Sequence, residues 1–314
     1  MRSIGRVFSS PRVLAYAAIY LLWGGSFLAI RDIVAVTPPF FAAGFRFLLA
    51  GGALYLLTRL RGAPRPTGVQ WRHSLGLGVV MFGGNYACLF WSEQRLASGI
   101  AAVLTAMVPV WIFLGEWLVF RTQRLTGGTL AGIVLGMGGV VLLSRATAGG
   151  SIRSANSIAA LVLLLGTLLF SIGTLWSRRL TLPSDQAMRA ALQMLLGGGV
   201  LFALAAGSGE LRHIEAALHA WRWHTAFSML YLIVAASIVA FTAYTWLIHH
   251  EPATRVASYA YVNPVVALAI GISFAHERMS PGEWAGAALI IAGVLATLLG
   301  KQRTASAVAR SLEQ

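Results

Sequence analysis

Long runs of apolar residues, separated by short polar stretches, follow one another along nearly the whole chain. A helix needs about 20 apolar residues to cross a bilayer core about 30 Å thick. Two runs contain one charge each and eight contain none: Pro38–Thr58 and Leu96–Phe120, then Val13–Ile30, Ser74–Ser92, Leu125–Ser144, Ser154–Ser177, Ala190–Ser208, Thr225–Ile248, Val256–Ala275 and Trp284–Gly300. The pattern predicts an all-α integral membrane protein with ten transmembrane helices.

Composition supports this class, since 57% of the residues are hydrophobic and only 11% are charged. The net charge of +14 does not indicate nucleic-acid binding, because no polar stretch is long enough to form a soluble basic module. The basic residues instead favour alternate loops. One side of the membrane receives Arg2, Arg6, Arg12, Arg59, Arg61, Arg65, Arg72, Arg121, Arg124, Arg178, Arg179, Arg189, Arg255, Lys301, Arg303 and Arg310, and the other receives Arg31, Arg95, Arg145, Arg153, Arg212, Arg222 and Arg278.

Positively charged loops remain in the cytoplasm, so this bias predicts a cytoplasmic tail at each terminus, over residues 1–12 and 301–314. We expect a multi-pass protein of the bacterial cytoplasmic (inner) membrane.

The second half of the chain repeats the first. Pro109, in "AVLTAMVPVWIFL", matches Pro264, in "ASYAYVNPVVALAIG", at an offset of 155 residues. Further on, "RLTGGTLAGIVLGMGGVVLL" from Arg124 matches "RMSPGEWAGAALIIAGVLAT" from Arg278. We therefore predict two five-helix units, residues 13–145 and 154–300. Because five is odd, the second unit enters the membrane from the opposite side, and such inverted repeats are typical of secondary transporters.

Four segments also resemble a known family: "LLWGGSFLAIR", "PPFFAAGFRFLLAGG", "WSEQRLASGIAAVLTAMVPVW" and "PATRVASYAYVNPVVALAIG". They are similar to the EamA-type members of the drug/metabolite transporter superfamily. The resemblance implies ten helices, cytoplasmic termini, a central cavity lined by the first, third and fourth helices of each half, and export of metabolites or drugs. One departure is that Glu277, in "HERMS", has no acidic counterpart in "RTQRLT" of the first half, which argues against a symmetrical role for it.

Several helix faces combine aromatic and polar residues. Trp23 and Phe27 share a stripe with two tyrosines, Asn85 cannot be satisfied by hydrocarbon, and Tyr259 and Asn263 lie one turn apart. Each residue has an ordinary alternative role, either packing against a neighbouring helix or bonding to a carbonyl of its own helix. The candidate lining of a substrate cavity is Trp23, Phe27, Asn85, Thr105, Pro109, Thr174, Phe241, Tyr244, Tyr259, Asn263 and Pro264.

The two prolines are expected inside helices, where each frees a backbone carbonyl one turn earlier, near Thr105 and Ala260. Freed carbonyls at matching depths in two inverted helices indicate a binding site near the midplane. The alternative is that the prolines only bend their helices and shape the cavity.

Charged residues within spans are functional candidates. From the helical rise, Arg46 lies about 12 Å and Glu116 about 28 Å from the outer ends of their spans, so we do not expect them to pair. We interpret Glu116 as a solvated carboxylate at the cytoplasmic interface, in preference to a proton-coupling role. Arg46 is expected to reach toward Glu93 at the outer mouth, in preference to binding an anionic substrate, and Glu93 is the first candidate for a titrating residue.

The preferred function is a secondary active exporter of small metabolites, such as amino acids or related amphipathic compounds, or of drugs. It would work by alternating access, as a monomer or homodimer, with lipid and a small-molecule substrate as partners and protons as the candidate coupling ion. An integral membrane enzyme acting on lipid-linked substrates is the alternative, although the ten acidic residues are scattered. A channel or scaffold without coupled transport is another. Neither Cys88 nor the loop residues His249, His250 and His276 have metal-ligand spacing, so we expect no metal or cofactor and solvated histidines.

Overall fold

The structure is a computed structural model that describes residues 11–121, 126–147, 155–251, 256 and 258–312. Most of the predicted N-terminal tail, the first residue of the predicted second unit and the last two residues of the chain lie outside this part. Within it, every regular element is a helix. The first half contains α2 (Pro11–Val34), α3 (Pro39–Leu60), α4 (Gly68–Leu77), the π-helix η1 (Gly78–Gly84), α5 (Asn85–Glu93), α6 (Ser98–Thr105), α7 (Val108–Leu118) and α8 (Gly127–Thr147).

The second half begins with α9 (Ala155–Ser177) and α10 (Gln186–Gly207) and includes a second π-helix, η3. After α10 the chain forms the 3₁₀-helix η2 (Glu210–His213), α11 (Ile214–His219), α12 (Trp223–Tyr231), the π-helix η3 (Leu232–Val239), α13 (Ala240–His250), α15 (Tyr259–Ala275) and α16 (Pro281–Leu312). Seven of these helices or continuous helical stretches are long and apolar enough to cross a membrane, and three shorter apolar helices lie within α8, α15 and α16.

Helix starts follow local capping chemistry. The Thr67 hydroxyl accepts a bond from the Gln70 amide, and the Gln70 side chain accepts one from the Thr67 amide, which forms a capping box at the start of α4. The Asp185 carboxylate accepts a bond from the Met188 amide, 2.7 Å away, and so caps α10. Pro39 occupies the first turn of α3, where its missing N–H costs nothing.

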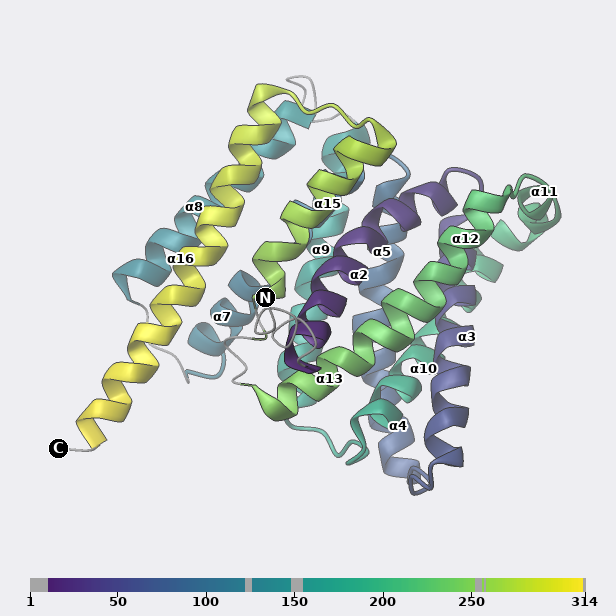
Figure 1. The fold of residues 1–314 in the computed structure, drawn as a ribbon, viewed down its shortest axis with the longest axis horizontal. Coiled ribbons are helices and arrows are strands. Elements are labelled where there is room, and N and C mark those ends of the chain that lie inside the picture. The colour runs from purple at the N-terminus through teal and green to yellow at the C-terminus, as the bar shows by residue number, and fades with distance from the viewer. Residues whose placement is uncertain (1–10, 122–125, 148–154, 252–255, 257, 313–314) are drawn as a thin grey trace, which may run out of the picture.

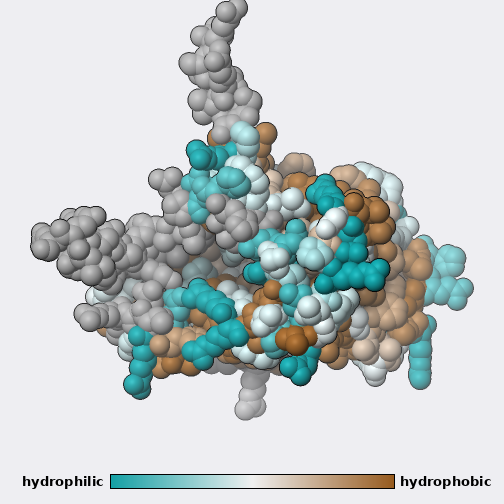
Figure 2. Space-filling model, turned by 90° about the horizontal axis from the view of Figure 1, so that it is seen from below, coloured by the Kyte–Doolittle hydropathy of each residue, from teal (hydrophilic) through white to brown (hydrophobic). Residues whose placement is uncertain are grey.

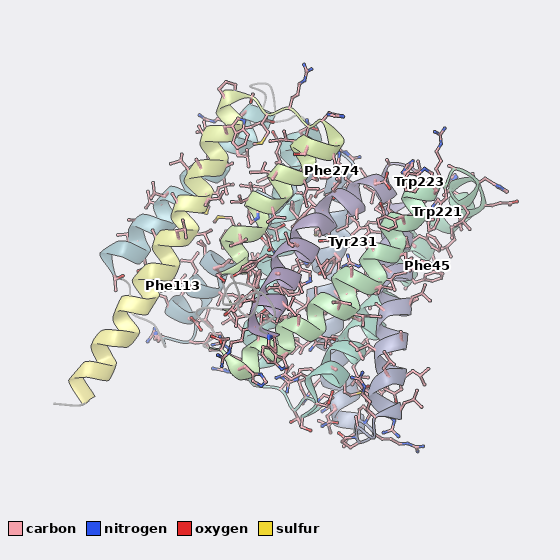
Figure 3. All side chains as sticks on the ribbon, viewed as in Figure 1. Phe45, Phe113, Trp221, Trp223, Tyr231 and Phe274 are labelled. Atoms are coloured by element: carbon pink, nitrogen blue, oxygen red, sulfur yellow. The ribbon has the colours of Figure 1, made fainter. Side chains whose placement is uncertain are left out.

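The helices form three groups (Figure 1). α8 and α16 pack together at one side, and α3 packs on α10 at the other, with α2, α9 and α15 between them. The lower end of the molecule carries hydrophilic side chains across its middle, with hydrophobic ones at its margins (Figure 2). Large apolar side chains such as Phe274 on α15 are exposed, as expected of a surface that contacts lipid (Figure 3).

Glycines bring the helices of the two side pairs into backbone contact. A Cβ atom added to Gly198 of α10 would lie 2.9 Å from the Leu48 nitrogen of α3. One added to Gly139 of α8 would lie 2.7 Å from the Ile290 nitrogen of α16. These positions show the close approach that small residues permit between membrane helices.

Candidate functional site

Four of the predicted cavity residues meet in one aromatic cluster. The Trp23 ring of α2 lies 5.2 Å from Tyr244 of α13 and 5.3 Å from Tyr259 of α15, measured between centroids. Tyr244 also lies 5.9 Å from Phe241. The Trp23 indole N–H donates to the Ala236 carbonyl of η3 at 2.9 Å, which fixes the ring. Residues from α2, η3, α13 and α15 therefore converge here, and the four rings remain partly exposed.

The glycines beside Trp23 do not leave open space. A Cβ on Gly24 would lie 2.6 Å from Val266 of α15, and one on Gly25 would lie 2.8 Å from the Tyr231 hydroxyl of α12. That hydroxyl donates to the Leu22 carbonyl at 2.9 Å, so Tyr231 lies between α12 and α2 (Figure 3). At these two glycines the helices pack closely.

The remaining polar candidates are satisfied to different degrees. The hydroxyls of Thr105 and Thr174 each donate at 2.8 Å to a carbonyl of their own helix, which is the ordinary alternative weighed for them. Asn85 is buried, and its backbone lies against Gly166 of α9. Asn263 is also buried, and its Oδ1 has no hydrogen-bond partner among the described residues. Phe27 belongs to the hydrophobic core.

The two prolines do not act alike. Pro264 lies inside the continuous helix α15, as predicted. Pro109 does not, because α6 ends at Thr105 and α7 begins at Val108, which places the proline in the first turn of a new helix. The prediction of a helix-interior proline is therefore wrong at Pro109. The physical reason is that a first-turn proline breaks no intrahelical bond once the chain has turned at Ala106 and Met107.

The interpretation of Glu116 as a solvated carboxylate is wrong. Its side chain is only 4% exposed and forms an ion pair with Arg178, which follows α9, at 2.7 Å. Arg46 and Glu93 are close enough to interact electrostatically, but no hydrogen bond or ion pair joins them. Arg46 donates instead from Nε to the Ser237 hydroxyl of η3 at 3.1 Å, and both Glu93 carboxylate oxygens are buried without a hydrogen-bond partner in the described part of the chain.

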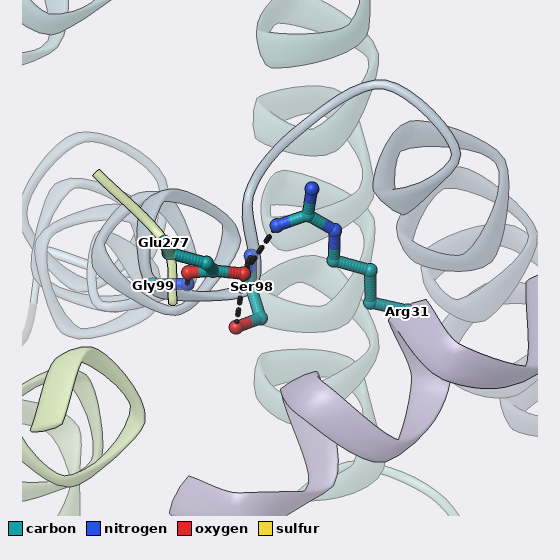
Figure 4. Close-up of polar contacts among 4 residues, drawn as sticks. All are labelled: Arg31, Ser98, Gly99 and Glu277. Carbon is teal, nitrogen blue, oxygen red and sulfur yellow. Dashed lines mark hydrogen bonds and ion pairs between the residues drawn. The ribbon is translucent and has the colours of Figure 1, made fainter. Parts of the chain in front are cut away.

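Glu277 organises a polar site that the sequence analysis missed (Figure 4). Its carboxylate, 6% exposed, pairs with Arg31 at the end of α2. It also accepts bonds from the Ser98 amide at 2.9 Å, the Ser98 hydroxyl at 2.8 Å and the Gly99 amide at 3.3 Å. A carboxylate is favourable at this position because the first amides of α6 have no intrahelical acceptor.

The ion pair of Glu116 with Arg178 resembles that of Glu277 with Arg31. In both pairs a carboxylate near the end of an apolar span meets an arginine near the end of α2 or α9. In the sequence repeat the position that matches Glu277 is Gln123, and Glu116 stands seven residues before it, so the two carboxylates do not occupy matched positions. Matching Arg31 with Arg178 in the sequence was the available signal.

The ion pairs of the described residues lie at two ends of the molecule. Arg12, at the start of α2, pairs with Glu251 at 2.9 Å, and Arg31 follows 19 residues later, about 28 Å along the helix. We call the end of the molecule that contains Arg12, Glu116 and Arg178 the Arg178 end. The opposite end, which contains Arg31 and Glu277, is the Arg31 end. His224 contacts Asp32 at 2.9 Å at the Arg31 end.

Two surface hollows also lie at the Arg31 end. They measure about 500 and 510 Å³ and are lined by residues around α11, including Glu210 in one and Trp221 in the other. Neither is lined by residues of the aromatic cluster. They are loop-side features and do not extend the candidate site.

The fold and the apolar helices define an all-helical membrane protein. A model of the EamA-like transporter family matches residues 12–145 and again residues 157–299. The chain belongs to this family, within the drug/metabolite transporter superfamily, and is thus a membrane transporter.

Named relatives agree with this assignment. An "Uncharacterized inner membrane transporter YedA" of Escherichia coli is 32% identical over 293 residues, which cover 93% of this chain and 92% of the relative. A "Probable amino-acid metabolite efflux pump" of Salmonella typhimurium is 26% identical, with 90% and 93% covered. A solved crystal structure shares the fold at a TM-score of 0.62 and 21% identity, covering 94% of this chain and 99% of that one.

Proposed function

We propose that the chain is a secondary active exporter of small metabolites that works by alternating access between two inverted five-helix units, the first over residues 13–145 and the second over residues 154–300. The family model matches the two halves separately, and the sequence repeats around Pro109 and Pro264 support a duplication. The packing of α3 on α10 and of α8 on α16 fits the same symmetry, since each pair joins corresponding helices of the two units.

The observation that carries the proposal is the placement of the ion pairs. The arginine–carboxylate pairs of the described residues, and the His224–Asp32 contact, each join a residue of the first family match to one of the second. They occur at both ends of the molecule, with the aromatic cluster between them. Breaking the pairs at one end while those at the other remain would open the centre to one side at a time.

The arginine bias supplies the orientation. The side with the larger number of basic residues, which includes Arg59 and Arg61, is the side of the Arg178 end. We therefore place this end and both termini in the cytoplasm of a bacterial inner membrane. One chain contains both units, and a monomer therefore suffices for the cycle.

The substrate class is taken from the site and from a relative. Aromatic rings with hydroxyl and amide groups suit an amphipathic solute, and one relative is named an amino-acid metabolite efflux pump. We propose amino acids or related compounds, exchanged for protons with Glu93 as the titrating group. Glu93 is buried and lacks a hydrogen-bonding partner among the described residues, which makes its charge state sensitive to its surroundings.

The test is counterflow in proteoliposomes with a panel of amino acids and amphipathic cations, with and without an imposed pH gradient. We expect saturable counterflow that falls at least about tenfold in Trp23→Ala, because a fixed ring of the site is lost. Trp284→Ala, at an exposed position on α16, is the matched control and should retain it.

The Glu93→Gln variant should lose the response to the pH gradient. A wild type that ignores the gradient would contradict proton coupling alone. Flux that never saturates would favour a channel, and no flux for any solute would favour a scaffold or an enzyme.

A further inference from the structure

Arg46 on α3 and Glu93 at the end of α5 are buried charged residues with unused hydrogen-bonding atoms. Arg46 is 3% exposed and Glu93 is 1% exposed. The Nη1 atom of Arg46 and both carboxylate oxygens of Glu93 lack a partner among the described residues. An unpaired buried ion costs several kcal/mol, as an order of magnitude. These three atoms are therefore available to complementary groups on a ligand.

The guanidinium of Arg46 is fixed on one side only. Its Nε donates to the Ser237 hydroxyl at 3.1 Å, and that hydroxyl donates to the Leu232 carbonyl at 2.8 Å within the π-helix η3. The guanidinium carbon lies 4.7 Å from the Phe47 ring and 5.6 Å from the Tyr86 ring, which holds the plane of the group. Nη1 is thus left for another acceptor. π-helical turns often occur at functional sites.

The charged groups near the Glu93 carboxylate either pair with other residues or do not hydrogen-bond to it. The charges that act on it are those of Glu277, Arg31 and Arg46. Arg31 is held by Glu277, as described above. Arg46 remains, close enough to interact electrostatically with Glu93 and without a hydrogen bond to it. Tyr86 and Tyr231 are the other ionisable groups that act on Arg46.

Aromatic rings line the arginine side of this region. Phe47 lies 4.5 Å from Tyr86 and 5.1 Å from Phe82, between centroids. A ligand bound at Arg46 would therefore find an apolar surface beside a positive charge. This combination suits a small solute with an apolar side chain and a carboxylate.

We propose that Arg46 and Glu93 bind the two charged groups of a zwitterion of the α-amino acid class, with Arg46 binding the carboxylate and Glu93 the ammonium. The inference deepens the proposed function and rests on it. A planar guanidinium matches a carboxylate geometrically, and a zwitterion leaves the total charge of the site unchanged. A proton on Glu93 competes with the ammonium, so solute and proton exclude each other, as an exchanger requires.

The experiment is competition against counterflow in proteoliposomes that contain the full chain. Alanine, leucine and phenylalanine are each compared with the amide, which lacks the carboxylate, and with the deamino acid, which lacks the ammonium. We expect both analogues of the best competitor to be at least about tenfold weaker, because either one leaves a buried charge unpaired.

Three variants separate binding from structure. In Arg46→Gln the preference for the amino acid over its amide should fall to within about twofold, whereas Arg46→Lys should retain part of it. Arg212→Gln, the same substitution at an exposed arginine of η2, is the matched control and should retain the preference. If Arg46→Gln does not fold, Glu93→Gln should lose the preference for the amino acid over its deamino acid.

Wild-type protein that exchanges amides as well as amino acids, or an Arg46→Gln variant that keeps the preference, would overturn the zwitterion site. Counterflow of amphipathic cations alone would also overturn it and leave the transport mechanism standing. No counterflow of any solute would overturn the transport mechanism, and the site with it.

Discussion

The two family-matched segments are joined in two different ways. At the sides of the molecule, α3 meets α10 and α8 meets α16 through glycines, so that backbone touches backbone. At its two ends the same segments are joined by side-chain ion pairs, such as Arg31 with Glu277 and Arg178 with Glu116. The first kind of contact brings backbone against backbone, and the second joins charged side chains.

This difference separates fixed contacts from exchangeable ones. Close-packed glycine crossings depend on shape, and a change of even one methyl group is felt there. In each ion pair the arginine is partly exposed, at 41% for Arg31 and 59% for Arg178, and it can turn to water. The carboxylates are 6% and 4% exposed, so a pair opens at small cost only where water reaches the carboxylate as well. We therefore expect the two segments to move about the glycine crossings while the ion pairs at the ends break and form.

The largest effect is expected where a glycine crossing is filled. In Gly198→Ala the new Cβ would lie 2.9 Å from the Leu48 nitrogen and 3.1 Å from the Phe47 carbonyl carbon, so α3 and α10 must separate. We expect the free energy of unfolding to fall by about 1–3 kcal/mol. Gly199→Ala is the matched control, because no atom lies within 4 Å of its added Cβ.

Thermal unfolding of the purified protein in detergent measures both variants. The control should be neutral or more stable by about 0.5–1 kcal/mol, since alanine is the better helix former. Equal melting temperatures for Gly198→Ala and Gly199→Ala would show that this crossing is not closely packed.

A smaller effect is expected from reversing the ion pairs at the ends. Glu116→Arg with Arg178→Glu keeps one charge of each sign and should restore most of the counterflow lost in either single variant. Glu277→Arg with Arg31→Glu should remain about tenfold below wild type, because arginine has no acceptor for the Ser98 and Gly99 amides. The measurement is counterflow beside thermal unfolding. Equal rescue at both ends would refute the distinction between them.

The smallest effect is expected at Glu210, which lies in η2, outside the spanning helices, and hydrogen-bonds to the start of α3. Burial raises the pKa of its carboxyl group, although bonds from the Phe41 amide at 2.8 Å and the Phe40 amide at 3.4 Å act the other way. A raised pKa in the folded state means that the folded protein binds this proton more tightly than the unfolded chain does. Its contribution to stability is therefore present at low pH and is lost as the pH rises through the folded pKa.

The measurement is the melting temperature of the wild type and of Glu210→Gln as a function of pH, from about pH 4 upward. The wild type should lose more stability across this rise than Glu210→Gln does. A steeper loss in the variant would mean that the amide bonds to the carboxylate outweigh its burial.

Apolar run length predicted the helices well, because it is a local property. Every predicted run overlaps a helix or a continuous helical stretch, for example Val256–Ala275 with α15 and Ser154–Ser177 with α9. The cluster of Trp23, Tyr244 and Tyr259 was also anticipated in membership, because stripes of aromatic and polar residues follow from helical spacing.

Partners of charged residues could not be predicted in the same way. Glu116 meets Arg178 and Arg46 meets Ser237 across 62 and 191 residues of sequence. Such contacts depend on how helices from different halves are placed, which no local pattern encodes. The π-helices η1 and η3 were also absent from the prediction, since their apolar sequences read as ordinary helix.

The break between α6 and α7 has a mechanical consequence. The span formed by α6 and α7 is attached to the other family-matched segment at both ends, by Ser98 to Glu277 and by Glu116 to Arg178. A continuous helix such as α15 transmits a tilt or rotation along its whole length, whereas two short helices joined at Ala106 and Met107 do not. We therefore expect the two anchors to be coupled less rigidly to each other than the two ends of α15 are.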